Sequence, residues 1–106
     1  MPAPMRYRLQ YLPLFWDDLN SAVTYISETL GNPQAASRLI DETEASILTH
    51  LDNPTIAPIY KTTRQRPLPY YWLEVGNYMV FYVVFDDVME VRRMVYGARA
   101  LTQMLP

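Results

Sequence analysis

Basic side chains gather in the second half of this sequence, at positions that suit binding to an anionic partner. Arg92, Arg93, Tyr96 and Arg99 lie along and just beyond one strand-like run, and a basic loop, KTTRQR, precedes it. Eight of the nine basic residues are arginines, whose planar guanidinium suits bidentate recognition of carboxylate or phosphate. Solvated surface charge with ordinary ion pairs is the alternative interpretation of the same residues. We expect the end of the sheet that carries these residues to take part in function.

The composition excludes several kinds of site. The chain has no cysteine, which rules out disulfides, thiolate zinc sites and cysteine catalysis. Its one histidine, His50, cannot by itself form a multi-histidine metal site or relay, and we expect it to be a surface or capping residue. We therefore expect neither a metal nor another cofactor.

Length and hydropathy place the chain among small globular domains. Its 106 residues are 50% hydrophobic, which is enough for one domain over residues 1–106 with a core of its own. No apolar run is long enough to cross a bilayer and no signal peptide is visible, so we expect a soluble cytoplasmic protein. Net charge is −2, but residues 1–55 carry −4 and residues 56–106 carry +2. The excess positive charge therefore lies in the strand-rich half of the chain.

Strands must position the basic residues. Two turn signals, Gly76-Asn77 and Asp86-Asp87, divide residues 71–99 into three runs rich in β-branched and aromatic residues. This pattern predicts an antiparallel meander. The middle run, residues 78–85, is apolar on both faces, which is typical of a central strand covered on both sides. An earlier short strand is predicted over residues 6–11.

Two amphipathic helices precede the meander, over residues 16–30 and 33–52. Gly31 suits the C-terminal cap of the first, and Asn32-Pro33 suits the N-cap and first position of the second. The short link predicts an antiparallel hairpin on one face of the sheet. The predicted inward stripes are Leu19, Ala22, Val23, Ile26 and Leu30 in the first helix, and Ala36, Leu39, Ile40, Thr43, Ile47 and Leu51 in the second.

The predicted fold class is therefore α+β, in the order β-α-α-β-β-β, with a helical hairpin on one face of an antiparallel meander sheet. Residues 54–69 contain four prolines and the basic run, so we expect a loop with a short edge strand near Ile59. The segment after Arg99 is expected to form a final turn of helix. One apolar face of this sheet lacks a cover, which a partner segment could supply.

The sequence resembles the RelE/ParE superfamily of toxins from type II toxin–antitoxin systems, which includes plasmid-stabilisation toxins. The resemblance covers nearly the whole chain and rests on three segments in this order: DLNSAVTYISETLGNPQAASRLIDE, NYMVFYVV and VRRMVYGAR. It implies a toxin neutralised by a cognate antitoxin protein that wraps an extended or helical segment around it.

The superfamily divides by target. RelE-like members are metal-independent mRNA interferases: on the ribosome, the 2′-hydroxyl attacks the adjacent phosphate while basic residues stabilise the developing charge. ParE-like members instead inhibit DNA gyrase. If this chain is RelE-like, the resemblance implies a catalytic role for Arg99, while Arg93 and Tyr96 are candidate substitutes that could supply positive charge and a hydroxyl. RNA- or target-binding roles fall to Lys61, Arg64 and Arg66.

Most of the RelE catalytic set is missing here. Arg99, in YGAR, matches the arginine that follows the last strand of those enzymes, and it would equally suit a structural role. Met79 stands where they carry an arginine, and Tyr70 and Trp72 replace their paired lysines. The catalytic tyrosine falls at about Leu105. Three functions stay open: mRNA cleavage, gyrase inhibition, or an inactive toxin fold retained as a protein-binding partner.

Overall fold

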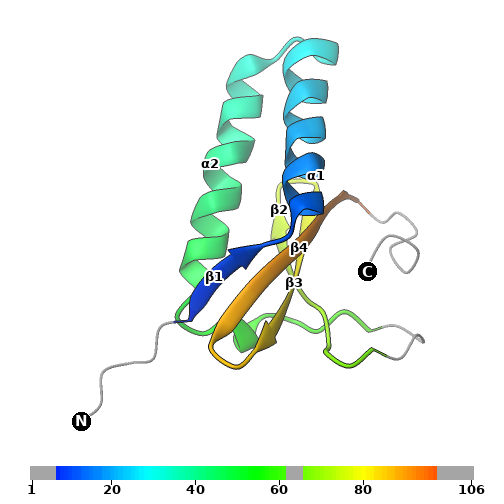
Figure 1. Cartoon of the computed structure of the whole chain (residues 1–106). Coiled ribbons are helices and arrows are strands. Elements are labelled where there is room, and N and C mark those ends of the chain that lie inside the picture. The colour runs from blue at the N-terminus through cyan, green and yellow to red at the C-terminus, as the bar shows by residue number, and fades with distance from the viewer. Residues whose placement is uncertain (1–6, 62–65, 98–106) are drawn as a thin grey trace.

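A computed structural model describes residues 7–61 and 66–97 of the chain (Figure 1). The predicted order of elements and the α+β class are confirmed. The main elements are β1 (Arg8–Tyr11), α1 (Pro13–Thr24), α2 (Pro33–His50), β2 (Tyr71–Val75), β3 (Tyr78–Phe85) and β4 (Val88–Tyr96). A π-helical turn, η1 (Tyr25–Thr29), continues α1, and a short 3-10 helix, η2 (Pro54–Ile56), follows α2. No helix in the described ranges is long and apolar enough to cross a membrane.

The sheet has the strand order β1-β4-β3-β2, which places β3 inside it as predicted. β2, β3 and β4 form the predicted antiparallel meander, whereas β1 joins β4 in parallel. Both predicted turns are present, with positive φ angles at Gly76 (57°) and Asp86 (51°). The edge strand expected near Ile59 is reduced to a single bridge to Tyr71.

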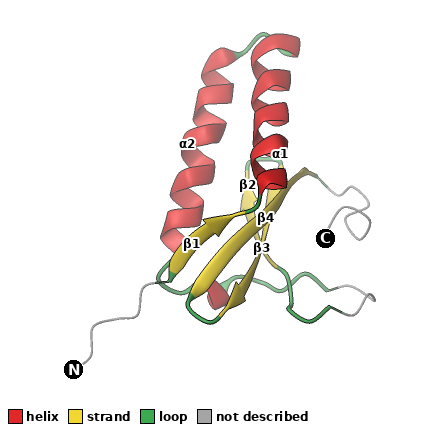
Figure 2. Ribbon diagram, viewed as in Figure 1, coloured by secondary structure: helices red, strands yellow, loops and turns green. Residues whose placement is uncertain are grey.

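The two helices run antiparallel on one face of the sheet and extend past its end (Figure 2). α1 begins three residues earlier than predicted, because Pro13 occupies a first-turn position where its missing N–H costs nothing. Gly31, at φ 62°, follows η1, as predicted for a helix end. Asn32 caps α2 by accepting a hydrogen bond from the Ala35 N–H at 3.1 Å.

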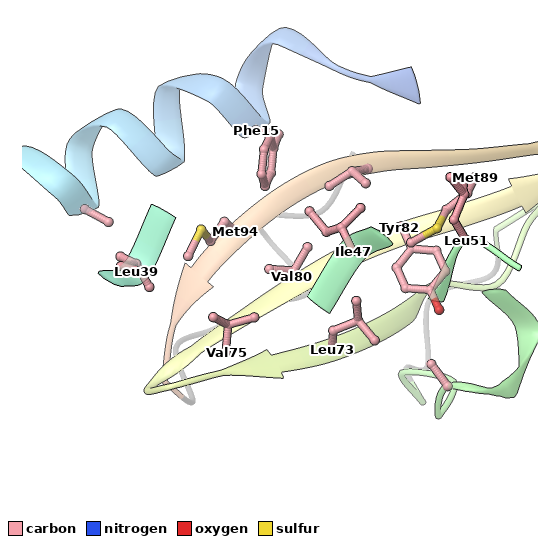
Figure 3. Close-up of a cluster of buried hydrophobic side chains, with 13 residues drawn as sticks. Phe15, Leu39, Ile47, Leu51, Leu73, Val75, Val80, Tyr82, Met89 and Met94 are labelled. Atoms are coloured by element: carbon pink, nitrogen blue, oxygen red, sulfur yellow. The ribbon is translucent and has the colours of Figure 1, made fainter. Parts of the chain in front are cut away.

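The main core lies between the hairpin and the sheet (Figure 3). Ala22, Leu39, Ile47 and others from the predicted stripes are buried there. Two predicted members are instead exposed, Ile40 by 40% and Leu30 by 58%. Ile40 lies beside the stripe that residues 36, 39, 43 and 47 follow. Leu30 follows the π-helical turn η1, whose wider winding departs from the α-helical spacing on which the predicted stripe depends.

The opposite face of the sheet, which we call the second face, carries a smaller core. Phe81 and Val83 are fully buried there. The rings of Tyr60 and Tyr70 meet Phe81 edge-on, with centroids 5.4 and 6.3 Å apart. The prediction of an uncovered face is therefore wrong at its centre, because the chain's own loop before β2 packs on it.

Tyr82 is expected to make the stability of this fold depend on pH in alkaline solution. Its hydroxyl donates to the Pro54 carbonyl, and burial raises its pKa well above the ordinary value of about 10. The folded chain keeps a proton that the unfolded chain releases above about pH 10, so stability should fall as pH rises further. Tyr82→Phe should flatten that fall and cost about 1 kcal/mol near neutral pH.

Urea denaturation followed between about pH 7 and pH 11 measures both effects. Burial also raises the pKa of Tyr11, so the stability of the Tyr82→Phe variant should still fall with rising pH, but with a smaller slope. An alkaline loss of stability equal in Tyr82→Phe and the wild type would contradict this assignment.

Candidate functional site

A β-bulge in β4 sets the positions of two neighbouring arginines. Phe81 pairs with Arg93 and Tyr82 pairs with Val91, so Arg92 is the extra residue. Strict alternation after Val91 would turn Arg93 toward the helices. The bulge instead keeps both arginines out of the helix-side core.

Arg93, a predicted catalytic residue, is held by Asp18 of α1. Its Nε and Nη2 donate to the two carboxylate oxygens at 2.7 and 2.9 Å, and both side chains are only 15% exposed. The Met94 N–H donates to the same carboxylate at 2.9 Å. This edge of β4 lies beyond the last residue pair with β1, Tyr11 with Val91, so Asp18 satisfies an amide that no strand reaches. The hydrogen bonds that Arg93 donates to Asp18 raise the pKa of the Arg93 guanidinium above its ordinary value.

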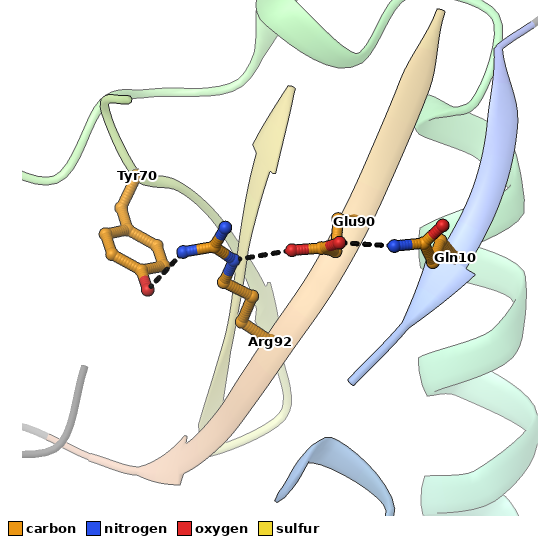
Figure 4. A network of polar contacts seen from close by, with 4 residues as sticks. All are labelled: Gln10, Tyr70, Glu90 and Arg92. Carbon is orange, nitrogen blue, oxygen red and sulfur yellow. Dashed lines mark hydrogen bonds and ion pairs between the residues drawn. The ribbon is translucent and has the colours of Figure 1, made fainter. Parts of the chain in front are cut away.

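Arg92 belongs to a second network, which sequence reasoning missed (Figure 4). Its Nε donates to Glu90 at 2.8 Å and its Nη1 donates to the Tyr70 hydroxyl at 3.3 Å. Gln10 of β1 donates to the other Glu90 oxygen. Glu90 and Tyr70 are buried, and a buried carboxylate requires such partners. The network ties β1, β4 and Tyr70, the residue before β2, together and neutralises Arg92.

The predicted binding loop is only partly described. Lys61 is exposed, and the Arg66 guanidinium lies 5.3 Å from the centroid of the Tyr70 ring. A shallow pocket of about 330 Å³ is lined by Lys61, Arg66 and Tyr70, among others. The structure therefore brings these two basic residues together. Arg64 lies outside the described residues.

Tyr96, the predicted catalytic tyrosine, belongs to neither network, although it lines the same groove as Asp18. It is 50% exposed, and its ring meets Tyr78 edge-on with centroids 5.2 Å apart. It lines a groove of about 510 Å³ that includes Tyr25 and Leu30, which we call the Tyr96 groove. Arg99, Leu105 and the predicted final helical turn lie outside the described residues.

The remaining polar residues do not suggest a metal site. No group of three metal-ligating side chains occurs within residues 7–61 and 66–97. His50 lies in the last turn of α2, with its Nδ1 2.9 Å from the Ser46 carbonyl oxygen, in keeping with the predicted capping position.

The described residues do not assemble an exposed set for phosphodiester cleavage. Arg92 and Arg93 are each paired with a carboxylate, and Tyr70 is buried. Met79 and Trp72 give apolar surface on the second face, where RelE-like enzymes would carry cations. The surface offers instead grooves lined by exposed aromatic and aliphatic side chains, which suit binding to a protein segment.

Comparison with known proteins gives one matching family model and solved structures with a similar fold, two of which are described here. The sequence model described as the ParE toxin of the type II toxin–antitoxin system parDE matches residues 9–101. A chain of the chromosomal ParDE system from P. aeruginosa is similar, with a TM-score of 0.67 and 12% identity over 91% of this chain and 100% of that one. A chain of the archaeal RelE–RelB complex from Pyrococcus horikoshii OT3 has a TM-score of 0.53 and 21% identity, with the same coverage. No curated protein sequence matches.

Proposed function

Because the chain belongs to the ParE toxin family of type II toxin–antitoxin systems, we propose that it arrests growth by binding DNA gyrase. A cognate antitoxin protein is the partner that neutralises it. The two similar structures are described as a ParDE system and a RelE–RelB complex, which supports a partner of this kind.

One observation carries the choice of gyrase over messenger RNA. Both β4 arginines are neutralised by carboxylates within the fold, Arg92 by Glu90 and Arg93 by Asp18. Phosphodiester cleavage without a metal needs unpaired cations next to the reacting phosphate. Binding to a protein target needs only an exposed complementary surface, and the Tyr96 groove is one.

Two assays on the purified chain test the proposal. Gyrase supercoiling should be inhibited, and messenger RNA in a reconstituted translation reaction should stay intact. If messenger RNA is cleaved and gyrase stays active, the proposal is wrong and the chain has the RelE-like activity. Loss of toxicity in Arg99→Ala would then be expected, because Arg99 alone matches the catalytic pattern. If gyrase stays active, messenger RNA stays intact and the chain still binds its antitoxin, the result would favour an inactive toxin fold that binds a partner.

Tyr96→Ala should weaken gyrase inhibition by about tenfold or more, because exposed tyrosines at protein interfaces often contribute strongly to binding. Its half-exposed side chain makes a large loss of stability unexpected. Ile56→Ala is the matched control, since Ile56 is an exposed apolar residue on η2, outside this groove. Dose–response curves for supercoiling inhibition measure the difference, and equal potency of the two variants would exclude Tyr96 from the target surface.

A further inference from the structure

We propose that a pocket beside Arg66, on the second face of the sheet, binds a carboxylate side chain of the target protein. The pocket holds about 330 Å³, and we call it the Arg66 pocket. Its lining includes Ile59, Lys61, Arg66, Leu68, Pro69 and Tyr70. The inference rests on the proposed function only in taking gyrase as the target, and the binding of a carboxylate can be tested without gyrase.

The guanidinium of Arg66 is a charged group without an acceptor. It lies over the Tyr70 ring, with its central carbon 5.3 Å from the ring centroid. Its three nitrogens are shielded from solvent, and none has a hydrogen-bond partner among residues 7–61 and 66–97. A shielded cation that neither water nor a carboxylate pairs is costly, so this position favours an incoming acceptor.

The other guanidinium on the same ring indicates which acceptor is missing. Arg92 lies 5.7 Å from the Tyr70 ring centroid, and its Nε donates to the Glu90 carboxylate at 2.8 Å (Figure 4). Arg92 therefore has both an aromatic ring and a carboxylate, whereas Arg66 has the ring alone. A planar carboxylate can accept two parallel N–H bonds from a guanidinium. A carboxylate at Arg66 would complete the arrangement that Arg92 already has.

The rim of the Arg66 pocket suits a segment of a protein. Lys61 is exposed there and adds a second positive charge. Ile59 is 49% exposed and Pro69 is also exposed, so apolar surface lies next to the cations. No acidic residue lines the pocket in the described part of the chain. An acidic side chain flanked by apolar groups would complement this surface. The arginine side chain has several rotatable bonds, so a small movement can turn its outer nitrogens toward such a ligand.

A nucleic-acid backbone suits the Arg66 pocket less well. It presents a row of phosphates, and proteins that bind it place several cations along its path. Both β4 arginines are already paired with carboxylates, and Lys61 and Arg66 are the two cations that line the pocket among the described residues. A single carboxylate needs no more than these two cations.

Inhibition of gyrase supercoiling by variants of the full chain tests the protein ligand. Arg66→Gln should raise the concentration for half-inhibition by about tenfold, because the carboxylate of the target loses its guanidinium. Arg66→Lys keeps the charge but loses the planar fork, so it should recover only part of the potency. Arg38→Gln, at an exposed position of α2 outside the pocket, is the charge-matched control and should inhibit like the wild type. Concentrations are those of folded protein, measured by circular dichroism.

Thermal melting with acetate as the probe tests the pocket without gyrase. Acetate that binds the folded chain should raise the wild-type melting temperature by about 3 °C or more and reach a plateau, relative to chloride at equal ionic strength. The rise should persist in Arg38→Gln and disappear in Arg66→Gln. If the wild-type chain leaves gyrase active but shows this Arg66-dependent rise, the proposed function is wrong and the carboxylate site stands with another protein as its partner.

Equal rises in acetate for the wild type and Arg66→Gln would overturn the inference, and so would equal potency of these two chains against gyrase. Binding of a short DNA duplex by the wild-type chain that Arg66→Gln abolishes would assign the pocket to phosphate and also overturn it. If Arg66→Gln does not fold, Lys61→Gln decides the question at an exposed position. Its expected loss of potency is about threefold, and unchanged potency would count against the carboxylate ligand.

Discussion

Replacing Phe81 by alanine is expected to lower the free energy of unfolding by about 3–5 kcal/mol. The side chain is fully buried in the middle of β3 and contacts Tyr60 and Tyr70 on the second face. Its removal leaves a cavity that the backbone of an inner strand cannot easily close. Urea denaturation followed by circular dichroism measures the loss, which is a large part of the stability of a small domain.

Ile40→Ala is the matched control. The sequence pattern places Ile40 in the inward stripe, and a buried isoleucine at that position would cost about 2–5 kcal/mol on replacement by alanine. Because Ile40 is partly exposed beside an apolar groove that Trp16 and Leu48 also line, we expect a loss of less than about 1 kcal/mol. Equal losses in the two variants would contradict the burial that the fold assigns to them.

Replacing Asp18 by alanine should cost about 2–3 kcal/mol, the scale of hydrogen bonds to a charged group. The change leaves the Arg93 guanidinium without its carboxylate and the Met94 N–H without its acceptor. Arg93→Ala should lose a similar amount, and the double variant should lose much less than the sum. Thermal and urea denaturation of the three variants measure the free energies of unfolding for this double-mutant cycle.

The exposed pair of Arg8 and Asp87 supplies the control for the Asp18 cycle. It is also bidentate, with donor–acceptor distances of 3.1 and 3.0 Å, but it lies at the surface. We expect Asp87→Ala to leave the melting temperature nearly unchanged, because water screens such pairs. Additive losses in the Asp18 and Arg93 double variant would show that the two residues do not act as a clamp.

The Asp18 cycle also separates structure from function at Arg93. If Arg93 serves only to hold α1 on β4, Asp18→Ala and Arg93→Ala should reduce toxicity in proportion to folded protein. A larger loss of toxicity in Arg93→Ala at equal stability would assign Arg93 a direct part in action on the target.

The secondary structure and its order could be read from the sequence because the signals are local. Apolar spacing defined both helices, and Gly31, Asn32 and Pro33 marked the link between them. Two turn signals and a doubly apolar run defined the meander around β3. Each of these patterns depends on residues a few positions apart, which propensity and periodicity describe well.

The candidate site could be predicted only as a list of residues. Asp18 and Arg93 are 75 positions apart, and no local pattern indicates that they pair. The bulge had one visible signal, since the helix-side residues Met89, Val91 and Met94 are spaced by two and then by three. Ordinary ion pairs were one interpretation of these arginines, but no local pattern identifies the carboxylates that pair with them.

What the sequence by itself determined was the set of elements and the supply of positive charge in the second half of the chain. The tertiary structure decided which charges are already used, which apolar residues stay at the surface, and that the loop before β2 covers Phe81. These outcomes depend on contacts between segments distant in the chain. Their free energies depend on burial and on the partner that each charge finds, and both exist only once the sheet and the hairpin have packed.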